Sequence, residues 1–90
     1  MNNQRRKAIA QIIEQIGTLA GKLDDIRSEI ETIFDEERDA FAAMPEGLQQ
    51  SDRGQQSEQA GDQLESARDA IDEAINGLSE ATDALEEASQ

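Results

Sequence analysis

The side chains of this sequence that could do chemistry are carboxylates. The chain of 90 residues has 21 Asp and Glu against 8 Lys and Arg, and it contains neither His nor Cys. Without His and Cys, the sequence cannot form a zinc finger, a thiol nucleophile, a haem site or a Ser-His-Asp triad. Carboxylates can still bind a hard metal ion, transfer protons, or imitate the phosphates of a nucleic acid.

The spacing of the acids does not match a known metal site. The run from Asp35 to Asp39 lacks the Glu-x-x-His motif of a di-iron bundle. The segment from Ser51 to Asp62 lacks the alternating acids and the terminal Glu of a calcium-binding loop. We therefore expect no metal, no cofactor and no catalytic residue, and we predict that the protein is not an enzyme.

The acids are distributed unevenly, which makes them a candidate surface for binding a partner. Glu14 is the one acid before Leu23, and twenty acids follow. One interpretation is a solvated surface that keeps a long amphipathic protein soluble. The other is a surface that imitates nucleic acid and docks into the basic cleft of a host protein. The acids predicted for this contact are Asp24, Asp25, Asp35, Glu36, Asp39, Asp62, Asp69, Asp72 and Glu73.

The overall composition argues against direct contact with nucleic acid or with a membrane. A net charge of −13 repels phosphates, and two Phe as the only aromatic residues are too few for a base-stacking platform. No apolar run approaches the roughly 20 residues of a membrane span. The basic segment at residues 5–7 is followed by polar residues such as Gln11 and Glu14, unlike a signal peptide. We therefore expect a cytoplasmic protein.

Two long helices have to position these carboxylates. In the first helix, predicted for about residues 5–44, apolar residues alternate at intervals of three and four, which is typical of a coiled-coil seam. They fill the a and d positions of a heptad: Ile9, Ile12, Ile16, Leu19, Leu23, Ile26, Ile30 and Ile33. The seam fails at Glu37 and the apolar line moves to Phe34 and Phe41, which predicts local unwinding around Asp35 to Asp39.

A connector at about residues 45–51 joins this helix to a second one at about residues 52–88. Pro45 ends the first helix, and Gly47 permits a positive φ in the turn. Ser51 or Asp52 offers an N-cap, and Gly54 should soften the first turn. The second helix alternates large and small core residues, with Leu64, Ile71, Leu78 and Leu85 set against Ala60, Ala67, Ala74, Ala81 and Ala88.

The fold predicted from these elements is all-α. Residues 1–90 form one domain, a long antiparallel helical hairpin with coiled-coil-like packing. The apolar stripe on each helix is wider than one partner helix can cover, so we predict that the hairpin forms a homodimer, an antiparallel four-helix bundle. The residues expected outside the intramolecular seam and against the second copy are Ile13, Phe34, Phe41, Ile75 and Gly77.

The connector and its surroundings resemble a known group of proteins. These are short acidic proteins encoded by bacteriophages and prophages, and the similar residues are Phe34-Asp35-Glu36-Glu37, Phe41, Met44-Pro45-Glu46-Gly47-Leu48-Gln49 and Ser51-Asp52-Arg53-Gly54. The family has no assigned activity, so the resemblance transfers no functional residue. It implies a viral accessory role in the host cytoplasm, and it favours an inhibitor of a host defence or nucleic-acid-binding protein. The alternative is a structural or assembly protein whose hairpin self-associates without a host target.

Overall fold

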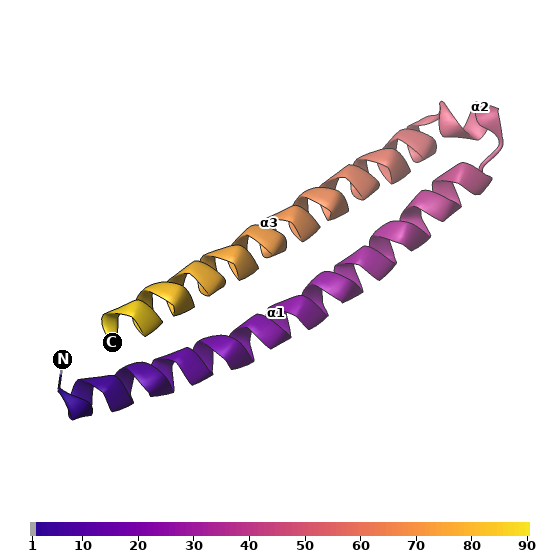
Figure 1. Ribbon diagram of the computed structural model, residues 1–90. Helices are drawn as coiled ribbons and strands as arrows, with labels where there is room; N and C mark the ends of the chain where they lie inside the picture. The colour runs from indigo at the N-terminus through magenta and orange to yellow at the C-terminus, as the bar shows by residue number, and fades with distance from the viewer. Residues whose placement is uncertain (1) are drawn as a thin grey trace.

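The protein is a helical hairpin in the shape of a rod. The computed structural model describes residues 2–90, and this range contains α1 (Asn3–Ala43), α2 (Glu46–Gln49) and α3 (Asp52–Ala88). The two long helices α1 and α3 run side by side in opposite directions, with α2 in the turn between them (Figure 1). The rod has Cα extents of 68 × 15 × 13 Å. The predicted all-α antiparallel hairpin is confirmed.

Both ends of α1 are explained by the residues next to them. Asn2 accepts a hydrogen bond from the backbone N–H of Arg5 at 2.8 Å, so the helix begins at Asn3 rather than near residue 5. Met44 has a φ of −68° and a ψ of 140°. A proline disfavours helical dihedrals in the residue before it, so Pro45 ends α1 at Ala43.

The connector is a single helical turn that is tied to both long helices. The Nε2 atom of Gln49 donates a hydrogen bond to the carbonyl oxygen of Phe41 at 3.1 Å, which fixes α2 against the end of α1. Ser51 caps α3, since its hydroxyl accepts a hydrogen bond from the backbone N–H of Gly54 at 3.3 Å. The predicted connector at about residues 45–51 therefore contains regular structure of its own.

Gly54 is the glycine that this turn requires. It is buried, and a Cβ atom built on it would overlap the carbonyl oxygens of Leu48 and Gln49. Gly47 was expected to supply a positive φ, but no residue between 2 and 90 has one. The close approach of the connector backbone to the first turn of α3, rather than an unusual dihedral angle, decides which glycine matters.

The seam between α1 and α3 follows a heptad pattern. The buried and half-buried residues of α1 step by four and three: Ile9, Ile13, Ile16, Ala20, Leu23, Arg27, Ile30, Phe34, Glu37 and Phe41. On α3 the main line is Gly54, Ser57, Gly61, Leu64, Arg68, Ile71, Ile75, Leu78, Thr82 and Leu85, with Ala60, Glu65 and Asp72 half-buried beside it. The seam therefore uses the predicted a positions together with the residues four positions after them.

The predicted d positions lie outside this seam, which corrects the register. Ile12, Leu19, Ile26 and Ile33 are 45%, 47%, 42% and 51% exposed. Ala67, Ala74, Ala81 and Ala88 are also exposed, so these alanines are not the core complement that was predicted. The apolar stripe of α1 is wide, so the helix could turn either the line that contains Phe34 or the line that contains Ile33 towards α3. The line that is buried on α1 continues through Phe34 and Phe41 to the connector, whereas the exposed line ends at Ile33.

The helix is continuous where unwinding was predicted. Asp35 to Asp39 lie within α1, and Glu37 occupies an ordinary seam position. Its carboxylate accepts a hydrogen bond at 2.7 Å from the hydroxyl of Ser57, which is 9% exposed. Because this half-buried carboxylate has a partner and α3 offers only small residues here, the polar pair fits in the seam without a break in the heptad pattern.

Four of the five residues predicted for self-association belong to the intramolecular seam instead. Ile13, Phe41 and Ile75 are half-buried there, and Phe34 is 7% exposed. Gly77 is exposed. These four side chains pack between α1 and α3 of one chain, so the prediction that they lie beyond the intramolecular seam is wrong.

Candidate interaction surfaces

The hairpin has two different long faces, one on each side of the seam. On each helix, the residue three positions after a seam residue such as Leu23 lies on one side of the seam. The residue one position after the seam residue lies on the other side. Two antiparallel helices are related by a two-fold axis normal to the plane of the hairpin, so equal offsets on the two helices fall on the same face. Ile26 and Ala67 therefore share one face, and Asp24 and Glu65 share the other.

The polar face contains the ion pairs that join the helices. Arg27 contacts Asp72 of α3 at 3.1 Å and Asp24 of α1 at 2.6 Å. The hydrogen bond with Asp72, and then the charge of Asp24, raise the pKa of Arg27 above its usual value, although partial desolvation opposes them. The residues that define the polar face are Asp24, Arg27, Glu31, Glu65, Arg68 and Asp72.

Arg68 makes the next set of ion pairs on the polar face, about one helical turn nearer the connector than Arg27. Its guanidinium lies 3.8 Å from Glu31 of α1 and 3.9 Å from Glu65 of its own helix. The same group lies 5.3 Å from the ring centroid of Phe34, and Arg38 lies 5.4 Å from that centroid. Two cations therefore contact the one buried large aromatic ring, an arrangement that stabilises by cation–π attraction.

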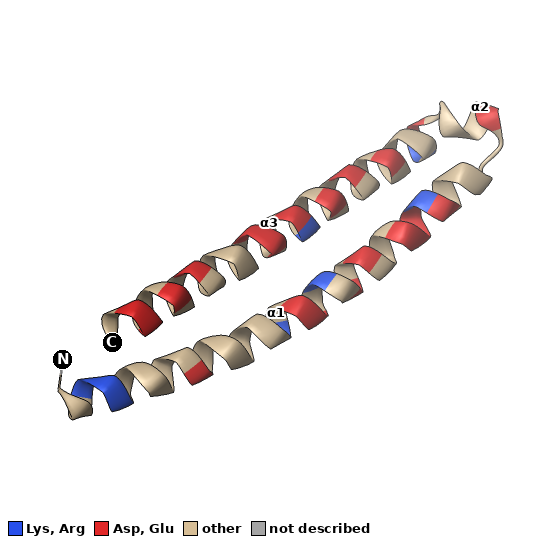
Figure 2. Cartoon of the chain, viewed as in Figure 1, with Lys and Arg blue, Asp and Glu red and all other residues tan. Residues whose placement is uncertain are grey.

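The hairpin itself uses three of the nine acids predicted for partner binding. Asp24 and Asp72 pair with Arg27, and Asp69 lies 3.4 Å from Arg68. The remaining six are exposed and have no ion pair with any Lys or Arg of residues 2–90: Asp25, Asp35, Glu36, Asp39, Asp62 and Glu73. Figure 2 shows acids along both long helices and the densest basic colour at the N-terminal end of α1.

A shallow groove lies on the rod near the connector. It has a volume of about 240 Å³ and is lined by Phe34 and Phe41 together with charged residues such as Glu37 and Asp62. Typical ligand pockets enclose about 300–1,000 Å³. The groove is thus smaller than a small-molecule site, and it is part of the surface beside the seam. Within residues 2–90, no group of three or more His, Cys, Asp or Glu is arranged to hold a metal ion.

The opposite face of the rod is apolar. We define the apolar face by Ile12, Leu19, Ile26 and Ile33 on α1 and Ala67, Ala74, Ala81 and Ala88 on α3. The next line outward on α3 is uncharged too, since it consists of Gln63, Ala70, Gly77 and Ala84. An exposed apolar line of this kind is a candidate interaction surface. None of the helices in residues 2–90 is long and apolar enough to cross a membrane.

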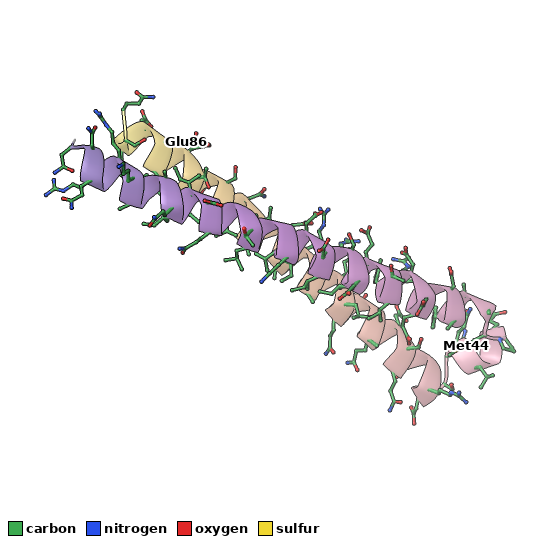
Figure 3. All side chains as sticks on the ribbon, turned by 90° about the horizontal axis from the view of Figure 1, so that it is seen from below. Met44 and Glu86 are labelled. Atoms are coloured by element: carbon green, nitrogen blue, oxygen red, sulfur yellow. The ribbon has the colours of Figure 1, made fainter. Side chains whose placement is uncertain are left out.

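These faces are surfaces along the rod rather than a compact site. Figure 3 shows side chains projecting from both long helices, with Met44 at the connector end and Glu86 near the opposite end. No protein family model, no curated protein and no solved structure matches the chain. Its function therefore has to be inferred from these surfaces.

Proposed function

We propose that this protein acts by binding another protein and not by catalysis, with its exposed acids occupying a basic groove that otherwise holds nucleic acid. The observation that supports this function is that six of the nine predicted acids are exposed and have no ion pair in the hairpin: Asp25, Asp35, Glu36, Asp39, Asp62 and Glu73. Because the hairpin does not neutralise them, their field is available to a basic partner.

The density of the acids supports imitation of nucleic acid. The chain has 21 acids along 68 Å of rod, or one per about 3 Å, against one phosphate per about 1.7 Å in duplex DNA. The resemblance of the connector to short acidic phage proteins favours a target in a bacterial host, such as a defence or nucleic-acid-binding protein in the cytoplasm. A direct contact with nucleic acid is not part of the proposal, since like charges repel.

The test is a variant in which five of the unpaired acids are neutralised: Asp25→Asn, Asp35→Asn, Glu36→Gln, Asp39→Asn and Asp62→Asn. Each exposed charge contributes little alone, but together they should weaken binding to a basic partner by several kcal/mol. The matched control removes the same charge at the other end of the rod with Glu14→Gln, Glu80→Gln, Asp83→Asn, Glu86→Gln and Glu87→Gln. The helical content of both variants is checked by circular dichroism.

The measurement is capture from a bacterial lysate at low and high salt, with duplex DNA as the competitor. A specific partner should be released by salt and by DNA, lost with the five-acid variant and retained by the control. If the variant captures the same protein with an unchanged salt dependence, the acids serve solvation and this function is wrong.

A second candidate function is assembly, in which the hairpin is a structural protein that associates with itself. The observation that favours it is the exposed apolar line Ile12, Leu19, Ile26 and Ile33, which the hairpin leaves uncovered. Salt separates the two functions: a charged contact weakens steeply with ionic strength, whereas an apolar one does not.

A further inference from the structure

We propose that the apolar face is covered by the same face of a second copy, related by a two-fold axis parallel to the rod. The result is a four-helix bundle in which α1 of each copy packs on α3 of the other. This inference deepens the assembly function and does not depend on the acidic surface. It replaces the self-association residues predicted from the sequence, most of which lie in the intramolecular seam.

The two halves of the apolar face are complementary in shape. On α1 the face is a ridge of large side chains spaced by seven residues, and on α3 it is a flat line of alanines with the same spacing. Two ridges against each other would hold the rods apart, and two alanine lines would leave a gap. Large residues against small ones fill the space between helices at native packing density. The chain therefore contains both parts of a self-complementary interface.

The levels of the residues along the rod match as well. Arg27 lies level with Asp72, and Glu31 lies level with Arg68, as their ion pairs show. By the register of these two pairs, Ile26 and Ile33 lie within about one residue of the levels of Ala74 and Ala67. A two-fold axis parallel to the rod exchanges the helices without moving any residue to another level. Ile26 and Ile33 of one copy then meet Ala74 and Ala67 of the other.

Charge also favours a second copy in this orientation. Between Ala60 and Ala88 the part of α3 on the apolar face has no charged residue, so the acids of α3 stay on the outer surfaces. Arg5 lies seven residues before Ile12, at the level of the end of α3, where Arg6 already donates a hydrogen bond to the carbonyl oxygen of Ser89 at 3.0 Å. In the dimer, Arg5 falls beside the C-terminal end of the second copy's α3, where a cation is stabilised.

The size of the face suits a stable dimer. From Ile12 to Ile33 the helix is about 32 Å long, and two helices are about 20 Å wide, which makes an area of about 600 Å² per copy, near the lower end for specific interfaces. Specific interfaces bury about 800 Å² per partner. The remaining symmetric arrangement, with the axis perpendicular to the rod, would place α1 on α1 and bring Lys22 of both copies together near the axis. That arrangement opposes large residues to each other and like charges to each other.

The first experiment tests the dimer with Ala74→Leu, measured by multi-angle light scattering at micromolar concentration. The unaltered chain should have the mass of two chains, and the variant should have the mass of one, because the added side chain occupies the space of Ile26 of the second copy. The matched control is Ala10→Leu, an exposed alanine outside the apolar face, which should remain dimeric. A monomeric unaltered chain, or a dimeric Ala74→Leu variant, would overturn the proposal.

The second experiment tests the orientation by disulfide cross-linking, for which the absence of native Cys is an advantage. Leu19→Cys and Ala81→Cys, placed on separate chains that are then mixed, should give a covalent dimer of the two variants on a non-reducing gel. Leu19→Cys with Ile26→Cys should give one only if the axis is perpendicular to the rod.

The cross-linking outcomes separate the inference from the functions proposed above. A covalent dimer through residues 19 and 26, or none between the Leu19→Cys and Ala81→Cys chains, overturns this orientation and leaves assembly as a function. A monomer in light scattering overturns assembly as well. Neither result changes the test of the acidic surface, which uses other residues.

Discussion

Phe34 is the most buried apolar side chain of the seam. It is 7% exposed, and the guanidinium groups of Arg38 and Arg68 lie over its ring at 5.4 and 5.3 Å. The groove beside it is also lined by Ser57 and Gly61, so small residues of α3 leave room for the ring. Truncation of Phe34 thus removes both apolar burial and the surface on which two cations rest.

We predict that Phe34→Ala lowers the free energy of unfolding by about 3 kcal/mol, as expected for a buried Phe. Urea denaturation at a concentration where the chain is monomeric provides the measurement. The control is the adjacent Ile33→Ala, which is 51% exposed in the hairpin and should cost less than about 1 kcal/mol. Equal losses for the two variants would show that the register of the seam is wrong.

The interactions of Arg27 should not depend on pH in the usual working range. Its pKa is raised by the hydrogen bond with Asp72 and by the charge of Asp24. A cationic group with a raised pKa contributes stability below its unfolded pKa and loses it as the pH rises through its folded pKa, which for arginine is far above neutral. The difference in melting temperature between the unaltered chain and Arg27→Gln should be constant from about pH 6 to about pH 9. A difference that shrinks steadily towards pH 9 would contradict the assignment.

At the scale of the elements, the connector decides how α3 returns along α1. The end of α2 packs against the start of α3, and the contact is so close that only a hydrogen atom fits on the α-carbon of Gly54. Ser51 caps α3 at the same point, and Gln49 binds the carbonyl of Phe41. The end of α1, the turn and the beginning of α3 therefore form one unit.

Gly54→Ala should lower the free energy of unfolding by about 2 kcal/mol or more, because backbone atoms have to move to admit a methyl group. Gly47→Ala is the matched control in the same connector. A Cβ atom there meets nothing within 4 Å, and the residue has no positive φ. This change should be neutral or should stabilise by up to about 1 kcal/mol. Thermal melts of both variants distinguish a requirement for close approach from a general need for flexibility.

At the scale of the whole molecule, a net charge of −13 opposes association of two identical rods. The apolar contact proposed here keeps the acids on the outer surfaces but does not remove their repulsion. Salt screens this repulsion, so the dimer should become tighter as sodium chloride rises from about 50 mM to about 500 mM. Sedimentation equilibrium measures the dissociation constant. A dimer that dissociates in high salt would show that ion pairs, and not the apolar face, hold the copies together.

The secondary structure and the antiparallel hairpin follow from local properties of the sequence. Heptad spacing predicts two long helices, and Pro45 predicts the end of the first because it constrains the residue before it. The bounds of α1 and α3, Asn3–Ala43 and Asp52–Ala88, lie within a few residues of the predicted ones. These properties depend on near neighbours along the chain, so the sequence by itself determined them.

The choice of the buried line depended on the tertiary structure. Each helix offers apolar residues on both sides of its central line, and periodicity alone does not say which side faces the other helix. Three features favour the side that is buried. Phe34 and Phe41 are covered there, Arg27 pairs with Asp72, and Glu37 fits against Ser57. Glu37 and Ser57 are 20 positions apart in the sequence, and Arg27 and Asp72 are 45 apart. Only the packing of α1 against α3 brings them together. That same choice leaves Ile12 and Ile26 exposed, and with them the surface for a second copy.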